Sequence, residues 1–348
     1  MKLAVKYLTL LFFCITGLAI RLYNIAFQEM NYDELFTIDF ASVNLTTTQL
    51  VVQALSVDFT PPLYYIAAHF SMLLFGETAF AIRFPSAIFG MLLIPVMYLA
   101  GKHYRDELFG ILLAGFATFF YTFVYYSRYG RSYSLELLLF SITFLLFMKA
   151  LNGDYNTKCL FAVFASLTMW THLYSAIPIA IMMVILLWQC RVELEEFLWF
   201  GIIVGMCIPL LNYIPIILST RQLATNDFGA TPLEIALVTP FDLFAYSTIV
   251  IVPIILWQLW KHRDEYIIRI ICLISIISWL SMFVLSFQTP IILHYQLYLV
   301  PMLLLAFVLP FYEMIKQKHI ALPYLYCIGI IALMEALQIW FAWTMQRQ

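Results

Sequence analysis

The chain has 348 residues, of which 64% are hydrophobic, 18% are aromatic and only 11% are charged. Soluble domains carry about 25% charged residues, so this composition excludes a soluble globular protein. The formal net charge of −2 does not indicate a class of partner, because the sidedness of charge matters in a membrane protein, and no basic patch predicts a nucleic-acid partner. Repeated apolar runs of roughly 20 residues are typical of membrane-spanning helices. We therefore expect an all-α polytopic membrane protein in which residues 1–348 form one membrane-embedded domain.

The first apolar run, residues 5–25, follows Lys2 and Lys6 and is similar to a signal peptide. It has no small-x-small cleavage site, and Arg21 lies where such a site is expected. We therefore expect a retained anchor helix. The other apolar runs lie near residues 61–80, 82–101, 108–127, 132–149, 158–174, 175–190, 197–218, 243–260, 266–286, 291–313 and 320–344.

Basic residues indicate which of these runs cross the membrane, because cytoplasmic loops are enriched in lysine and arginine. If residues 61–80 do not cross, the cytoplasmic ends gather Lys2, Lys6, Lys102, Arg105, Lys149, Lys158, Arg191, Lys261, Arg263, Arg269, Lys316 and Lys318. If that run did cross, most of these residues would move outside. We therefore predict about eleven spans, with a cytoplasmic N-terminus and with residues 61–80 docked at the outer surface.

The first extracytoplasmic loop, residues 26–80, contains "NYDELFTIDFAS", which carries Asp33, Glu34 and Asp39. Apolar residues alternate there with acidic ones, and "TTTQLVVQALS" opens with threonines that can cap a helix. Both stretches predict interfacial helices that lie on the membrane. A second outer loop, about residues 219–242, is polar enough to be mobile over a cavity.

In this topology the remaining unusual polar residues fall at the outer ends of the predicted helices. They are Glu77, Arg83, Arg128, Arg131, Tyr133, Glu136, His172, Tyr174, His294, Tyr295 and Tyr298. A charged side chain at membrane depth costs roughly 2.5–3.5 kcal/mol on insertion scales. Such residues are usually retained for a purpose, so their clustering indicates a functional site on the extracytoplasmic face.

Four stretches, in this order, resemble the GT-C superfamily of membrane glycosyltransferases: "NYDELFTIDFA", "PPLYYIAAHFSMLLFGETAFAIRFPSAIFG", "SRYGRSYSLELLLF" and "LHYQLYLVPMLLLA". The resemblance is greatest to the protein O-mannosyltransferase and aminoarabinose-transferase branch, and it is strongest over residues 20–150. It implies a polyprenyl-phosphate-linked sugar donor, an extracytoplasmic protein, lipid or glycan acceptor, and inversion at the anomeric carbon. It also implies that Asp33 is the base. Two positions depart from the pattern. Thr60 replaces a basic or histidine residue, and His294 replaces an arginine.

A polyprenyl phosphate is a good leaving group, so the reaction requires mainly a carboxylate base and cations that hold the phosphate. We predict Asp33 and Glu34 as catalytic residues, with Glu34 orienting the acceptor. The predicted phosphate ligands are Arg83, Arg128 and Arg131. The predicted contacts to sugar or acceptor are Tyr65, Tyr133, His172, His294 and Tyr295.

Each of these residue types also has a structural explanation. Asp33 has the chemistry of a helix N-cap, and Arg83 that of a snorkelling anchor at the membrane edge. His172 and His294 are compatible with purely structural hydrogen bonding. Tyrosines gather in any aromatic belt at a membrane interface. The sequence leaves these alternatives open.

Asp33, Glu34 and a histidine are also suitable ligands for a divalent cation. The chain has no H-x-x-x-H or D-x-D spacing, however, and arginines suffice to neutralise one phosphate, so we favour a metal-independent reaction. Two other classes of protein stay open. A transporter or flippase for a lipid-linked or small substrate would place polar sites near the membrane midplane. A non-catalytic lipid-handling protein would need no Asp-Glu pair.

Overall fold

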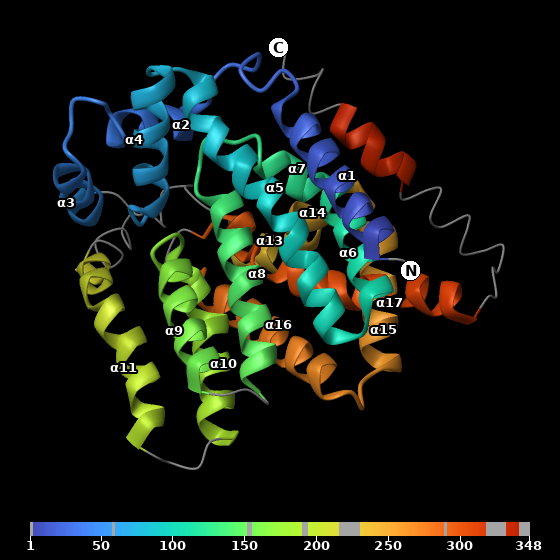
Figure 1. The fold of residues 1–348 in the computed structure, drawn as a ribbon. Helices are drawn as coiled ribbons and strands as arrows, with labels where there is room; N and C mark the ends of the chain where they lie inside the picture. Colours follow the sequence, from blue (N-terminus) through green and yellow to red (C-terminus); the bar gives the residue numbers. More distant parts are fainter. Residues whose placement is uncertain are drawn as a thin grey trace.

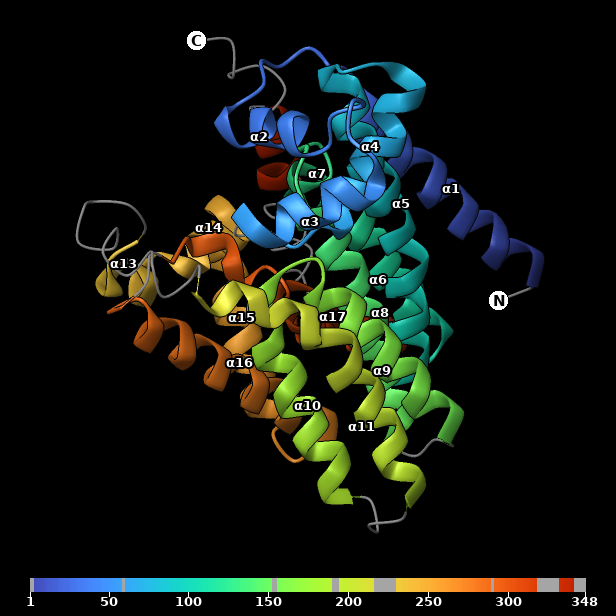
Figure 2. The ribbon, with the colours of Figure 1, turned by 90° about the vertical axis from the view of Figure 1, so that its left-hand side faces the viewer.

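The computed structural model describes residues 3–57, 60–151, 155–189, 194–215, 230–288, 291–317 and 332–340. Helices make up most of these segments, which contain no β-strand apart from one isolated bridge between Ala230 and Ile291. The long helices lie side by side in a bundle, and short helices cover its upper end (Figures 1 and 2). The predicted all-α fold is confirmed.

Six helices in the described segments are long and apolar enough to cross a membrane. They are α1 (Leu3–Leu22), α5 (Ala79–Tyr104), α8 (Tyr133–Ala150), α16 (Tyr266–Leu285), α17 (Leu299–Gln317) and the stretch Leu198–Pro215, which includes most of α11 (Leu194–Cys207). Shorter helices in the bundle are α6 (Glu107–Phe119), α9 (Tyr155–Met169), α10 (Ala176–Gln189) and α15 (Thr248–Lys261). The protein is an integral membrane protein. The number of spans and their direction stay predictions.

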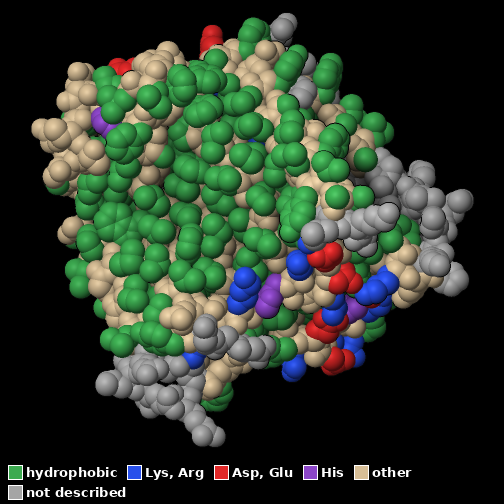
Figure 3. All heavy atoms as spheres, in the orientation of Figure 1, with side chains coloured by type: hydrophobic (Ala, Val, Ile, Leu, Met, Phe, Trp, Pro, Cys, Tyr) green, Lys and Arg blue, Asp and Glu red, His purple; other side chains and the backbone are tan. Residues whose placement is uncertain are grey.

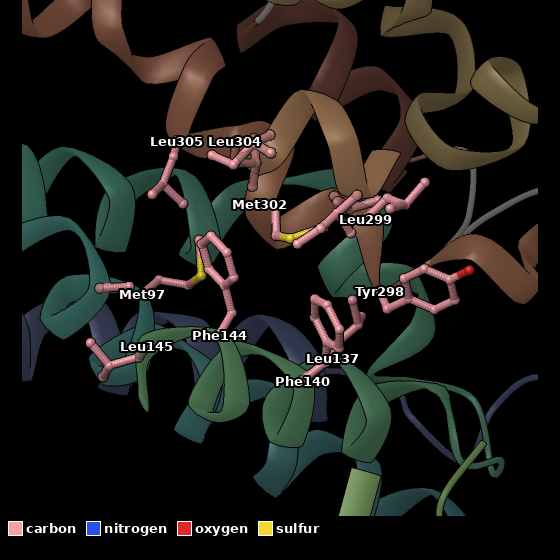
Figure 4. Close-up of a cluster of buried hydrophobic side chains, with 14 of the residues drawn as sticks. Met97, Leu137, Phe140, Phe144, Leu145, Tyr298, Leu299, Met302, Leu304 and Leu305 are labelled. Atoms are coloured by element: carbon pink, nitrogen blue, oxygen red, sulfur yellow. The ribbon is translucent and has the colours of Figure 1, made fainter. Parts of the chain in front are cut away.

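The core of the bundle lies between α5, α8 and α17. Phe140 and Phe144 of α8 lie against Tyr298 and Met302 at the start of α17, and Met97 of α5 lies beside them (Figure 4). The rings of Phe140 and Tyr298 are 5.5 Å apart. Most of the α8 and α17 residues are buried, whereas α1 exposes many large apolar side chains. This contrast places α8 and α17 inside the bundle and α1 at its lipid-facing surface.

The first loop forms the two predicted short helices, α2 (Tyr32–Phe40) and α3 (Thr47–Val57), followed by α4 (Leu63–Phe75). Their position on the membrane surface stays a prediction. Thr46 caps α3, because its hydroxyl accepts a hydrogen bond from the Gln49 N–H at 3.3 Å. Helix α4 has 13 residues, which is shorter than the roughly 20 residues that span a bilayer. It packs against α2, α3 and α5 at the upper end of the bundle. This position favours the docked arrangement predicted for residues 61–80.

The predicted span 108–127 is divided in two. Helix α6 ends at Phe119, Phe120 is extended with φ −65° and ψ 122°, and α7 (Tyr121–Tyr126) follows. The Tyr121 N–H at this break donates to the carboxylate of Glu335 in the helical segment 332–340. A helix start leaves backbone N–H groups without intrahelical partners, so Glu335 stabilises the break from a distant part of the sequence.

Ion pairs connect the helix ends at the opposite end of the bundle. They are Lys6–Glu107 (2.7 Å), Lys102–Glu107 (3.2 Å), Arg105–Glu265 (2.5 Å), Lys261–Glu313 (2.5 Å) and Lys316–Asp106 (2.9 Å). Figure 3 shows charged side chains gathered in one patch on a face that is otherwise mostly hydrophobic. Five lysines and arginines that the sequence assigns to cytoplasmic ends therefore lie together.

This arrangement makes the topology testable by single-cysteine labelling in a cysteine-free background. His103 is exposed at the end of α5, beside the charged patch, and Asp39 is exposed on α2. We expect a His103→Cys variant to react with a membrane-impermeant maleimide only after permeabilisation, and Asp39→Cys to react in intact cells. Labelling of position 103 from outside intact cells would contradict the predicted orientation.

Candidate active site

The first turn of α2 presents Asp33 and Glu34. The N-cap is Asn31, so the alternative that Asp33 caps this helix is wrong. Glu34 lies at the third helical position and accepts a hydrogen bond from the Asn31 N–H at 3.3 Å. Two carboxylates in a first turn also interact favourably with the positive end of the helix dipole.

Glu34 is 1% exposed and forms a bidentate ion pair with Arg83, which is 2% exposed. Arg83 Nε lies 2.7 Å from Glu34 Oε1, and Arg83 Nη2 lies 2.6 Å from Glu34 Oε2. The remaining N–H groups of Arg83 donate to the carbonyls of Ile25, Gln28 and Glu29 at 2.8–3.0 Å. Every N–H of this guanidinium therefore has an acceptor within residues 25–34.

Glu34 also holds the "SRYGRS" turn. Its Oε1 accepts a hydrogen bond from the Gly130 N–H at 2.7 Å, and the Thr37 hydroxyl donates to the Gly130 carbonyl at 2.8 Å. A Cβ at position 130 would lie 2.8 Å from Ile82 Cδ1 and 3.1 Å from Glu34 Oε1. A larger residue at position 130 would displace the side chain of Ile82, so glycine suits this close approach of the turn to the buried carboxylate of Glu34.

Arg128 is 6% exposed and also binds backbone. Its guanidinium donates to the carbonyls of Ile20, Arg21, Tyr23 and Asn24 at 2.5–3.4 Å. Arg83 and Arg128, both predicted as phosphate ligands, therefore hold the chain that leaves α1. The sequence analysis did not anticipate this structural role.

Arg131 occupies a different position, between α2, α4 and Thr60. Its Nη1 donates to the Tyr65 hydroxyl at 3.0 Å and to the Asp33 carbonyl at 3.4 Å, and its Nη2 donates to the Thr60 hydroxyl at 3.0 Å. The side chain is half-buried. Thr60, which departs from the family pattern, is thus a direct neighbour of a predicted phosphate ligand.

The three carboxylates of α2 have different environments. Asp39 is exposed, Glu34 is buried in its ion pair, and Asp33 is half-buried. The contacts of Asp33 with Thr37 and Arg131 are made by its backbone carbonyl. Burial, and next the charge of Asp33, raise the pKa of Tyr129 above its ordinary value. The Asp33 carboxylate therefore lies close to Tyr129 of the "SRYGRS" turn.

Tyr133 and His294 meet beside this turn. The Tyr133 hydroxyl and His294 Nε2 share a hydrogen bond of 2.8 Å, and their rings lie 4.8 Å apart. Burial, and then the nearby charge of Arg131, lower the pKa of His294 to about 4. His294 is therefore neutral at pH 7 and lacks the positive charge of the arginine expected from the family pattern.

His172 and Tyr295 extend the same cluster. Their rings lie 4.9 Å apart, and Tyr295 stacks on Tyr174 at 5.1 Å. His172 Nδ1 lies 3.4 Å from Oε1 of Glu136, which is fully buried at the start of α8. The structure therefore brings His172, His294, Tyr133 and Tyr295 together.

A cavity of about 280 Å³ lies beside Tyr133 and His294. Its walls include Tyr121, Tyr125, Tyr126, Tyr129 and one carboxylate, Asp242. Asp242 belongs to α14 (Thr239–Phe244), which follows α13 (Pro232–Leu237) within the described part of the second outer loop. Residues 219–229 of that predicted loop lie outside the described residues. The sequence analysis did not single out Asp242, since only the fold brings it to the tyrosines.

A larger apolar groove of about 730 Å³ runs between α1, α6, α17 and the segment 332–340. Its lining includes Phe13, Phe116, Phe119, Phe311, Ile339 and Trp340, and Glu335 lies at its inner edge. Glu335 contacts Tyr121 on the wall of the smaller cavity. The apolar groove and the polar cavity therefore adjoin each other at the break between α6 and α7.

Comparison with known proteins identifies the fold. Residues 60–215, less than half of the chain, match the family described as dolichyl-phosphate-mannose-protein mannosyltransferase. ArnT from Cupriavidus metallidurans bound to undecaprenyl phosphate aligns with a TM-score of 0.61 at 15% identity, over 86% of this chain and 59% of that protein. The chain has the GT-C fold. The predicted resemblance to the GT-C superfamily is confirmed.

Two structures from Archaeoglobus fulgidus show the same GT-C fold. The apo oligosaccharyltransferase aligns with a TM-score of 0.59 at 12% identity, over 99% of this chain and 56% of that one. AglB in complex with an inhibitory peptide and a dolichol-phosphate aligns with a TM-score of 0.57 at 12% identity, over 98% and 55%. The chain thus spans somewhat more than half the length of these proteins. Comparison with curated proteins gives no significant match.

A third Archaeoglobus fulgidus structure of this fold contains zinc and sulfate. In the described part of this chain, no three His, Cys, Asp or Glu side chains lie close enough together to hold a metal ion. Glu34, one of the predicted metal ligands, has its carboxylate on Arg83 and the Gly130 N–H. These donors do not fit a metal site, and the preference for a metal-independent reaction stays a prediction.

Proposed function

We propose that the protein is a glycosyltransferase that moves a hexosyl or pentosyl group from a polyprenyl-phosphate donor to an acceptor hydroxyl on the extracytoplasmic face. The observation that carries this proposal is the position of Asp33 and Arg131. The Asp33 carbonyl accepts from Arg131 at 3.4 Å, and Arg131 lies in the chain between Tyr129 and Tyr133, which line a polar cavity of the GT-C fold. The matched mannosyltransferase family and the polyprenyl phosphates named for ArnT and AglB support this donor class.

In the proposed reaction Asp33 acts as general base. Its carboxylate takes the proton of the acceptor hydroxyl as the acceptor oxygen attacks the anomeric carbon. The bond between that carbon and the phosphate oxygen breaks, and the polyprenyl phosphate leaves with both bonding electrons. Attack from the side opposite the phosphate inverts the anomeric configuration. Arg131 stabilises the negative charge that develops on the phosphate.

Glu34, Arg83 and Arg128 receive positioning roles in this proposal. Glu34 joins α2 to the turn that carries Arg131, so it fixes the distance between the base and the phosphate ligand. Arg83 and Arg128 hold the loop that precedes α2. Tyr65 orients Arg131 through its hydroxyl. Tyr133, His172, His294 and Tyr295 contact the sugar or the acceptor.

We assign the apolar groove to the polyprenyl chain. A chain of isoprene units is wholly apolar. Because the bilayer is as apolar as the groove, van der Waals packing against the groove walls, and not removal from water, favours its binding there. The groove is lined by aromatic and aliphatic side chains of α1, α6 and α17. The lipid would thus occupy the bilayer side of the α6–α7 break while its phosphate and sugar occupy the polar side.

A transporter or flippase is disfavoured by the position of the polar residues. Transporters place their substrate sites near the membrane midplane. Here the "SRYGRS" turn, which carries Arg131, is joined to α2 through Glu34 and Thr37. The direct test is to incubate the purified protein with polyprenyl-phosphate sugars and candidate acceptors, and to follow both by mass spectrometry. Consumption of the donor with an inverted glycoside as product supports the proposal, and lipid translocation without transfer contradicts it.

The proposed phosphate ligand predicts a specific loss of lipid affinity. Arg131→Ala is expected to weaken the binding of a polyprenyl phosphate about 10- to 100-fold, because a charged hydrogen bond contributes about 1.5–3 kcal/mol. Titration of the purified protein with the lipid measures this loss. Arg131→Lys should retain part of the affinity because it keeps the charge and loses the planar fork.

Arg269 supplies the matched control, since it is exposed on α16 at the opposite end of the bundle. Arg269→Ala should bind the lipid as tightly as the unchanged protein. An Arg131→Ala protein with unchanged affinity would remove Arg131 from the proposed mechanism.

A further inference from the structure

We propose that Asp242 and the tyrosine-lined cavity form the subsite for the sugar ring of the donor, and that Asp242 selects the sugar by accepting hydrogen bonds from its hydroxyl groups. This inference rests on the proposed function. It adds a recognition residue from the second outer loop, far in sequence from the Asp33 region.

The first observation is an unsatisfied carboxylate. Oδ2 of Asp242 is buried and has no hydrogen-bond partner within the described part of the chain. Buried polar atoms without partners are rare, and each calls for an explanation such as a missing ligand. Burial raises the pKa of Asp242 to about 6, so the group is still mainly ionised at pH 7. An ionised acceptor forms stronger hydrogen bonds than a neutral one.

The second observation is that the backbone holds Asp242 in place. The Thr122 hydroxyl of α7 donates to the Leu243 carbonyl at 2.6 Å, which fixes α14 against the tyrosine wall. Ala245, also on the cavity wall, has φ 49° and ψ −140°, which is strained for a residue with a side chain. A strained backbone conformation persists only where the surrounding structure enforces it, and such residues cluster at functional sites.

The third observation is the chemistry of the wall. Tyr121 stacks with Tyr125 at 5.5 Å, Tyr125 lies 5.1 Å from Tyr126, and Tyr126 lies 5.9 Å from His294. The rings offer apolar faces to the C–H face of a sugar. Tyrosine hydroxyls and a neutral imidazole both donate and accept hydrogen bonds, as sugar hydroxyls do. One carboxylate among such groups suits a neutral polyol.

The cavity is also in the right place and of a suitable size. Tyr129 and Tyr133 belong to its wall, and Arg131, which donates to the Asp33 carbonyl, lies between them in the chain. A volume of about 280 Å³ far exceeds the roughly 30 Å³ that one water occupies. A ring bound there would have its anomeric carbon at the end nearer to Asp33 and Arg131.

The experiment compares two classes of lipid on the same purified protein. One is a short polyprenyl phosphate without sugar. The other is a panel of the same lipid carrying glucose, mannose or galactose. In the unchanged protein, at least one sugar-bearing lipid should bind more tightly than the bare phosphate. Asp242→Asn should lower the affinity for that sugar-bearing lipid about tenfold and leave the affinity for the bare phosphate unchanged.

Asp39→Asn is the matched control, because Asp39 is an exposed carboxylate outside the cavity, and it should bind both lipids normally. Tyr125→Leu, which keeps an apolar side chain, should also lower affinity only for the sugar-bearing lipid. Equal effects of Asp242→Asn on both lipids, or no effect on either, would overturn the inference. So would the absence of any gain from the sugar in the unchanged protein. Failure to bind even the bare phosphate would instead refute the proposed function.

Discussion

Replacement of Asp33 by asparagine is expected to lower the rate of sugar transfer by roughly 10²–10⁴-fold, the usual contribution of a general base. Asparagine keeps the size of the side chain but cannot take the proton of the acceptor hydroxyl. Binding of the polyprenyl phosphate should persist, because Arg131 and the apolar groove contact the donor in our proposal. Single-turnover transfer and lipid titration, measured on the same preparation, separate the two effects.

Asp39→Asn provides the control for this prediction as well. It makes the same chemical change on the same helix, at an exposed residue, and its transfer rate should stay within about twofold of the unchanged rate, since surface substitutions usually have small effects. A folded Asp33→Asn protein with a normal rate would show that another group is the base. A larger loss in Asp39→Asn than in Asp33→Asn would lead to the same conclusion.

Breaking the ion pair between Glu34 and Arg83 should destabilise the fold. Glu34→Gln or Arg83→Gln alone leaves the other charge buried without its partner, which typically costs about 3–5 kcal/mol. Thermal unfolding of the detergent-solubilised protein measures the loss. The sequence analysis predicted a catalytic role for Glu34 in orienting the acceptor. The buried ion pair leads us to expect that loss of folded protein precedes any specific loss of acceptor affinity.

A double-mutant cycle tests the pairing itself. Glu34→Gln combined with Arg83→Gln should be less destabilising than the sum of the two single changes. The double variant removes both charges, so no buried charge is left without its partner. Lys261→Gln is the control, since its ion pair with Glu313 is partly exposed and such pairs contribute little in most proteins. Additive effects of Glu34→Gln and Arg83→Gln would contradict the proposed coupling.

Much of the fold could be predicted because its signals are local. Runs of apolar residues mark the long helices, and "TTTQL" with its capping threonine marks α3. The break at Phe120 could not be predicted, because the group that satisfies the freed Tyr121 N–H is Glu335, far along the chain. Residue type alone predicts a long apolar helix there.

The candidate site was predictable in part for a similar reason. The sequence marks Asp33, Arg131, Tyr133 and His294 as unusual polar residues at helix ends, and the structure places them in one region. The sequence does not reveal that Arg83 and Arg128 bind backbone carbonyls, since an arginine that holds a loop and one that holds a phosphate have the same side chain. Asp242 lies in a polar loop, where an aspartate is unremarkable.

The contact between Glu335 and Tyr121 has a consequence for biogenesis. Chains enter the membrane from the N-terminus during synthesis, and early segments fold first. The tyrosine wall on α7 therefore forms long before the segment 332–340 emerges. Until then the Tyr121 N–H lacks its carboxylate partner, and Ser247, which donates to the same Glu335 at 2.6 Å, lacks it too. The break between α6 and α7 and the Ser247 hydroxyl therefore gain their shared carboxylate partner only after the segment 332–340 has been synthesised.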